Sequence, residues 1–76
     1  MKELLEKIAR SIVDNPDDVS VTEVDDEQSL ILELRVAEED MGKVIGKQGK
    51  IAKAIRTLIK AAAVKENKHV VVEIVQ

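Results

Sequence analysis

The stretch VIGKQGKIAKAIR, residues 44–56, places two glycines three positions apart and follows them with spaced basic and aliphatic residues. The chain carries a net charge of -3, yet residues 41–60 hold six basic residues, no acidic residue and all three of the chain's glycines. The basic residues are Lys43, Lys47, Lys50, Lys53, Arg56 and Lys60. A charged run is commonly just a solvated helix surface, but this complete lack of acids around a glycine turn indicates an anionic partner.

The rest of the composition bounds the kind of protein. Seventy-six residues are enough for one domain, and with no cysteine neither disulfides nor a thiolate-bound metal can stabilise it. A hydrophobic content of 45% with 36% charged residues is typical of a globular chain held by aliphatic packing or by dimerisation. No run is long and apolar enough to span a bilayer, and the first sixteen residues do not resemble a signal peptide. We therefore expect a cytoplasmic protein without a membrane partner.

Periodicity predicts six elements in the order α-β-β-α-α-β. The predicted helices cover residues 2–13, 41–45 and 50–65, and the predicted strands cover 19–24, 29–36 and 69–75. Asn15-Pro16 ends the first helix, and the acids of residues 38–40 supply a capping residue and first-turn carboxylates for the second. The loop 46–49 separates the second helix from the third.

This order predicts an α+β architecture. The first two strands form an antiparallel hairpin, and the crossover of about thirty residues is long enough to bring the third strand back in parallel. The helices then cover one face of a three-stranded mixed sheet. The other face exposes a partly apolar set, which is either a contact surface or a set of ordinary edge-strand residues. Its members are Ile31, Glu33, Arg35, Val71 and Glu73.

The long helix is predicted to have two functional faces. At 100° per residue one arc is apolar and forms the core face, and it holds Ile51, Ile55, Leu58, Ile59 and Ala62. A separate arc holds Lys53, Arg56 and Lys60. The start of a helix presents free backbone N–H groups, and glycine lets another backbone pass close by. Loop, helix start and basic arc together indicate a phosphate-binding site.

Other glycine patterns fit poorly. A P-loop would need glycine at position 44 and serine or threonine at 51, where the chain has Val44 and Ile51. A dinucleotide fingerprint needs a third glycine and a preceding strand. A helix-turn-helix usually belongs to an all-helical trio, whereas strands flank both helices here.

The segment VIGKQGKIAKAI resembles the signature of KH domains, in which a G-x-x-G loop between two helices clamps four nucleotides. The element order resembles the type II arrangement of bacterial proteins, and residues 1–76 as a single KH domain resemble the small bacterial RNA-binding proteins of the KhpA kind. Ala52 departs from the pattern, since many KH domains carry a larger aliphatic residue there.

The resemblance implies a set of site residues and partners. The loop residues Gly46, Lys47, Gln48 and Gly49 would contact the sugar-phosphate backbone of single-stranded RNA, and single-stranded DNA is a possible substitute. Bases would lie in a groove lined by Val44, Ile45, Ile51 and Ala54. Lys43, Lys50, Lys53 and Arg56 would supply positive charge. The partners would be a second copy, a larger RNA-binding protein with its own KH domain, or both. Ala54 and the alanines at 61–63 either let another helix approach closely or are ordinary helix formers.

Two functions follow as hypotheses. The first is a low-specificity RNA chaperone or regulator that binds weakly, since the chain has no aromatic residue for base stacking. The second is a KH-shaped interaction module that works through a partner protein. We expect no catalysis, cofactor or metal, because the lone histidine, His69, has no cysteine beside it and the acids at 38–40 read as helix-start residues.

Overall fold

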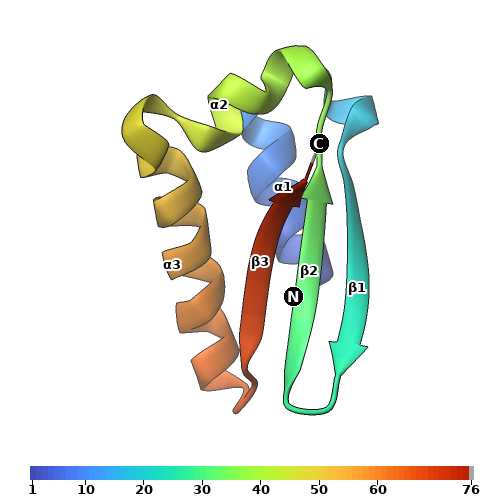
Figure 1. Ribbon diagram of the computed structural model, residues 1–76, viewed down its shortest axis with the longest axis vertical. Helices are drawn as coiled ribbons and strands as arrows, with labels where there is room; N and C mark the ends of the chain where they lie inside the picture. Colours follow the sequence, from blue (N-terminus) through green and yellow to red (C-terminus); the bar gives the residue numbers. More distant parts are fainter. Residues whose placement is uncertain (76) are drawn as a thin grey trace.

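The computed structural model describes residues 1–75 and has the predicted order of elements (Figure 1). The helices are α1 (Lys2–Ile12), α2 (Met41–Ile45) and α3 (Lys50–Lys65), and the strands are β1 (Ser20–Asp26), β2 (Ser29–Arg35) and β3 (Val70–Val75). Three short 3-10 turns lie between them, at Pro16–Asp18, Glu38–Asp40 and Lys47–Gly49. None of the helices in this described range is long and apolar enough to cross a bilayer.

The sheet has the predicted mixed topology. Its order is β1-β2-β3, with β1 antiparallel and β3 parallel to β2. The register aligns Val24, Ile31 and Val71 across the three strands on the face away from the core. Val24 and Val71 are exposed and Ile31 is half-buried, so this face is partly apolar, as predicted. Its use as a contact surface stays a prediction.

One hydrophobic core lies between this sheet and the helices. In Figure 1, α1 lies behind the strands and α3 lies alongside β3. Leu5 and Ala9 of α1 are fully buried, because the apolar positions of this helix recur at helical spacing. They pack in one cluster with Leu32 and Leu34 of β2, which alternate with outward-facing residues. A helical layer on one face of a mixed sheet is therefore confirmed.

The predicted core face of α3 is partly wrong. Ile55 and Ile59 are buried as expected, but Leu58 is 56% exposed and Ile51 37% exposed. The positions turned inward instead are Ala52 and Ala63. The buried arc of α3 is therefore turned toward the basic arc, and two of its four positions carry small side chains, which need little space in a close-packed core.

The predicted capping role of the acids at 38–40 is also wrong. Asp40 occupies the cap position of α2 but makes no side-chain capping hydrogen bond. Its carboxylate is buried and accepts hydrogen bonds from the chain just after α1. Long-range partners therefore took this side chain away from the local role that its sequence position favoured.

Candidate nucleic-acid interface

The glycine loop is a tight turn that exposes its two central residues. Gly46 has φ 75° and ψ 174°, a conformation that is essentially limited to glycine. Gln48 and Gly49 then adopt left-handed conformations, with φ of 59° and 75°. Lys47 and Gln48 are exposed, and the N–H of Gly49 donates to the carbonyl oxygen of Gly46 at 3.2 Å. The turn therefore presents one cationic and one amide side chain directly before α3.

The two loop glycines serve different purposes. A Cβ atom on Gly46 would lie 2.5 Å from Cγ1 of Ile51 and 2.9 Å from its backbone nitrogen. A Cβ atom on Gly49 would meet nothing within 4 Å. Gly46 is needed for the first turn of α3 to pack against the loop, so only Gly49 leaves open space for an approaching backbone.

The short helix before the loop is held by a buried anion. Asp40 is 1% exposed, and its carboxylate accepts hydrogen bonds from the N–H of Asp14 at 3.2 Å and the N–H of Asn15 at 3.0 Å. The side-chain amide of Asn15 donates a third bond at 2.9 Å. A five-residue helix is not stable alone, so these contacts to the end of α1 fix where α2, and hence the loop, lies.

The same contacts set the ionisation of two groups. Burial by itself would raise the pKa of the Asp40 carboxyl, but the Asn15 amide, the two backbone N–H groups and the charge of Lys43 together hold that pKa below its ordinary value. The ammonium of Lys43 donates to the carboxylate of Asp14, which raises the pKa of Lys43 despite partial desolvation. Lys43 is thus already paired within the molecule, whereas the ion pairs between residues 1–75 do not include Lys47.

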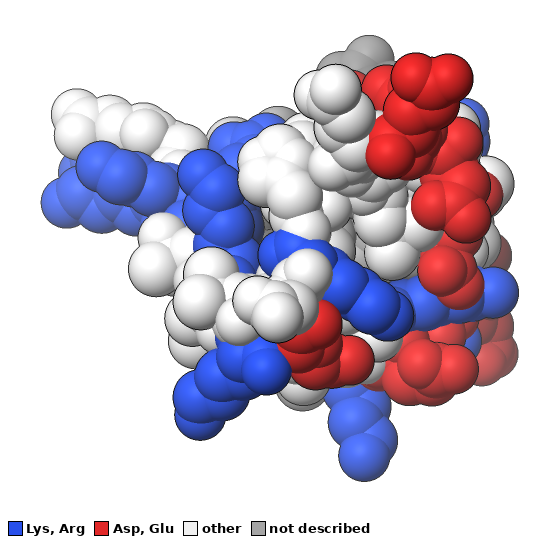
Figure 2. Space-filling model, turned by 90° about the horizontal axis from the view of Figure 1, so that it is seen from below, with Lys and Arg blue, Asp and Glu red and all other residues white. Residues whose placement is uncertain are grey.

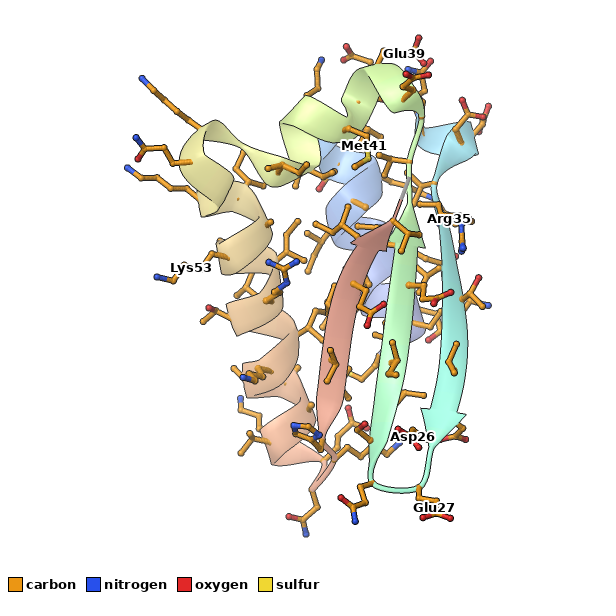
Figure 3. All side chains as sticks on the ribbon, viewed as in Figure 1. Asp26, Glu27, Arg35, Glu39, Met41 and Lys53 are labelled. Atoms are coloured by element: carbon orange, nitrogen blue, oxygen red, sulfur yellow. The ribbon has the colours of Figure 1, made fainter. Side chains whose placement is uncertain are left out.

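A groove lies between the basic arc of α3 and β3. Arg56 and Lys60 line one wall, and the other wall is formed by His69 with residues 70–72. Because β3 is the edge of the sheet, its outer carbonyl groups face this groove, and Nε of Arg56 donates to the carbonyl oxygen of Val72 at 3.3 Å. Lys53 projects outward from the same helix, one turn closer to the loop (Figure 3).

The structure brings only part of the predicted site together. Lys47, Gln48, Lys50, Lys53 and Arg56 are all exposed. They run from the loop along α3 toward the groove.

The apolar residues predicted to line a groove for the bases do not line the groove beside β3 in the structure. Val44 is fully buried in the core, so it supports α2 from beneath and lines no surface. Ile45 and Ile51 are each 37% exposed, and Ala54 is exposed as well. At 100° per residue, Ile51 and Ala54 lie on the flank of α3 opposite Arg56 and Lys60. They therefore do not line the groove beside β3.

The sequence prediction placed Lys60 in the basic arc but missed the β3 wall. His69 and residues 70–72 are remote from the glycine loop in sequence, and only the parallel pairing of β3 with β2 brings them beside α3. The helical spacing of Lys60 from Arg56 correctly placed both residues on one arc of α3, and both line the groove.

Charge is divided across the molecule. Seen from the hairpin end, Lys and Arg dominate the side of α3, whereas Asp and Glu gather over β1 (Figure 2). Within the described residues 1–75, no cluster of three or more His, Asp or Glu side chains is arranged to hold a metal ion.

Comparisons with known proteins agree with this geometry. The family model described as "KhpA/KhpB, KH domain" matches residues 2–74. The chain is 77% identical to the RNA-binding protein KhpA of Clostridium acetobutylicum and 72% identical to that of Clostridium perfringens, over 99% of this chain and 100% of each relative. Its identity to the RNA-binding protein KhpA of Halalkalibacterium halodurans is 55%, over 99% of each chain. No solved structure is a significant match.

Proposed function

The chain belongs to the KhpA/KhpB KH-domain family, and on this premise we propose that it binds single-stranded RNA through the loop Gly46–Gly49 and the basic arc of α3. The relatives are named RNA-binding proteins, and they match this chain over nearly its whole length. The observation that carries the proposal is the exposed Lys47–Gln48 turn at the head of α3, with Lys53 and Arg56 continuing along that helix.

The backbone of the loop contributes as much as its side chains. Gly49 stands at the N-terminal cap of the sixteen-residue helix α3, and no side chain caps that end. The first N–H groups of the helix, with the positive end of its dipole, favour a phosphate there. Lys47 and Lys50 add charge on either side of this position. Phosphate contacts of this kind hold the strand in place without reading its sequence.

The bases of the bound strand would lie in the groove beside β3. Free backbone groups at a sheet edge can donate to and accept from base edges, and Arg56 is held there by its hydrogen bond to Val72. The half-exposed Ile45 stays a predicted base contact, whereas Ile51 and Ala54 lie on the opposite flank of α3, so we propose the β3 groove in their place. Since the chain has no aromatic residue, we expect weak binding with little sequence preference, as in an RNA chaperone. Single-stranded DNA would be bound by the same phosphate contacts.

Self-association would compensate for weak binding by one site. On the flank of α3 opposite the basic arc, Ala54, Leu58 and Ala61 are exposed at helical spacing, and Leu58 is 56% exposed. We propose this apolar strip, Ala54–Leu58–Ala61, as the surface for a second copy or for a larger KH-containing partner. Of the alanines predicted for this contact, Ala63 lies in the core. The protein would act by binding and without catalysis, in the cytoplasm.

Fluorescence anisotropy of a labelled short single-stranded RNA tests the proposal. The variant Lys47→Asp/Gln48→Asp should abolish binding, because it places two anions at the phosphate position. The control Lys7→Asp/Ser11→Asp makes the same change in charge on exposed positions of α1. Binding by the wild type should weaken with salt by about 0.7 log units per log unit of salt for each phosphate contact.

The two candidate functions predict different results in this binding experiment. Retained binding in the loop variant, or equal loss in the control, would rule out the loop as the RNA clamp. If the folded wild type bound no RNA while a charge at Ala61 impaired function, the interaction-module hypothesis would be correct instead.

A further inference from the structure

The groove beside β3 and a second hollow, which is lined mainly by acidic residues, share one lining residue. His69 lines both: on one side it meets Arg56 and Lys60, and on the other it meets the tip of the β1–β2 hairpin. Four carboxylates line this second hollow, with Lys68 as the one ammonium group among its lining residues. These carboxylates, here called the hairpin acids, are Glu23, Asp25, Asp26 and Glu27.

The hairpin acids keep their charge toward the solvent. All four are exposed, and the ion pairs between described residues involve none of them. Among residues 1–75, the carboxylate of Asp26 accepts one hydrogen bond, from the N–H of Glu27 at 2.8 Å. Asp26 and Glu27 lie at the end of the molecule opposite Met41, which begins the helix before the glycine loop (Figure 3). Four carboxylates against the one ammonium of Lys68 leave this hollow with an excess of negative charge beside His69.

We infer that the hairpin acids form an electrostatic stop that ends the RNA track. The inference rests on the proposed function. A strand held at Gly46–Gly49 passes Lys53, Arg56 and Lys60 and reaches His69. The next phosphate then comes within about one Debye length, about 8 Å at physiological salt, of several carboxylates. Repulsion there cancels the binding free energy that further phosphates would contribute. The protein therefore holds a short segment and leaves the rest of the strand unbound.

A matched pair of variants tests the stop. Asp25→Asn/Asp26→Asn removes two of the hairpin acids while keeping side-chain shape and the Oδ1 acceptor of residue 26. The control Asp17→Asn/Asp18→Asn removes two exposed, adjacent aspartates from the 3-10 turn after α1, which is away from the groove. Both variants change the net charge equally. Unlabelled four- and ten-nucleotide oligouridine then compete with a labelled RNA for each protein.

In the hairpin variant, the ratio of the affinity for ten nucleotides to that for four should be about fivefold higher than in the wild type. This is the size of effect that two charges near a phosphate have in water. The control should keep the wild-type ratio. The difference should vanish near 1 M salt, where the Debye length is about 3 Å.

Three results would overturn the inference. An unchanged length ratio in the hairpin variant, with RNA binding intact, would rule out the stop and leave the proposed function standing. An equal rise in the control would show a general charge effect, and a rise that persists at high salt would show a non-electrostatic cause. Failure of the folded wild type to bind either length would overturn the proposed function and this inference together.

Discussion

The three glycines of this chain lie within eight residues and face different steric demands. Gly46 adopts a conformation essentially reserved for glycine, and the space beside its Cα is filled by Ile51. Gly49 is left-handed with open space around it, and Gly42 lies in α2, where an added Cβ atom would meet nothing within 4 Å. The spacing that suggested a phosphate loop thus includes one glycine, Gly46, that both its backbone conformation and its packing against Ile51 require.

Alanine substitutions should separate these cases. Gly46→Ala should lower the free energy of unfolding by about 1–3 kcal/mol. Alanine would be strained at this φ and ψ, and its Cβ atom would also lie too close to the backbone nitrogen of Ile51. Gly42→Ala should raise it by about 0.5–1 kcal/mol, since alanine is the better helix former. Urea unfolding followed by circular dichroism measures both, and equal effects at the two positions would contradict this account.

At the scale of elements, α2 depends on contacts outside itself. Val44 anchors it in the core, and the Asp40 carboxylate ties its start to the chain after α1 through Asp14 and Asn15. Since the glycine loop follows α2 directly, the same contacts determine where Lys47 is presented.

Acid should release this anchor. The pKa of Asp40 in the folded state lies below its ordinary value of 3.8, so its carboxylate stabilises the fold at pH values above 3.8. That contribution is lost as the pH falls through the lowered pKa. Asp40→Asn should therefore be less stable than the wild type at neutral pH, and the two should converge below pH 3.8. Urea unfolding across this pH range measures the difference, and a constant gap down to low pH would contradict the role of the charge.

At the scale of the whole molecule, α3 serves three surfaces at once. Its buried face holds Ile55 and Ile59, its basic arc borders β3, and its third face exposes the strip Ala54–Leu58–Ala61. RNA binding and self-association are thus assigned to separate flanks of one helix, and we expect mutations to separate them.

Leu58→Glu tests that separation. Because Leu58 is 56% exposed, the variant should fold normally. It should sediment as a monomer, while its affinity for a short RNA that fills one site stays within about twofold of the wild type. Val64→Glu, at a position 72% exposed and outside the strip, is the control. Analytical ultracentrifugation gives the outcome, and an unaltered dimer in Leu58→Glu, or a monomeric wild type, would rule out this surface.

Local patterns determined most of the fold. Alternation in residues 29–36, helical spacing in 2–13 and 50–65, and the proline after Asn15 each act over a few residues, so the sequence predicted the elements, their order and the mixed sheet. The glycine loop and the basic arc of α3 were equally readable, because both lie within one continuous segment.

How distant segments meet was set by the assembled fold. Asp40 left its predicted cap for donors some 25 residues away, and Lys43 was paired with Asp14. The packing of α3 left Leu58 exposed, and the burial of Val44 of α2 in the core placed that predicted contact out of reach. The same packing made His69 a wall of the groove. Side chains take the lowest-energy partners that the tertiary structure offers, and sequence spacing alone does not specify those partners.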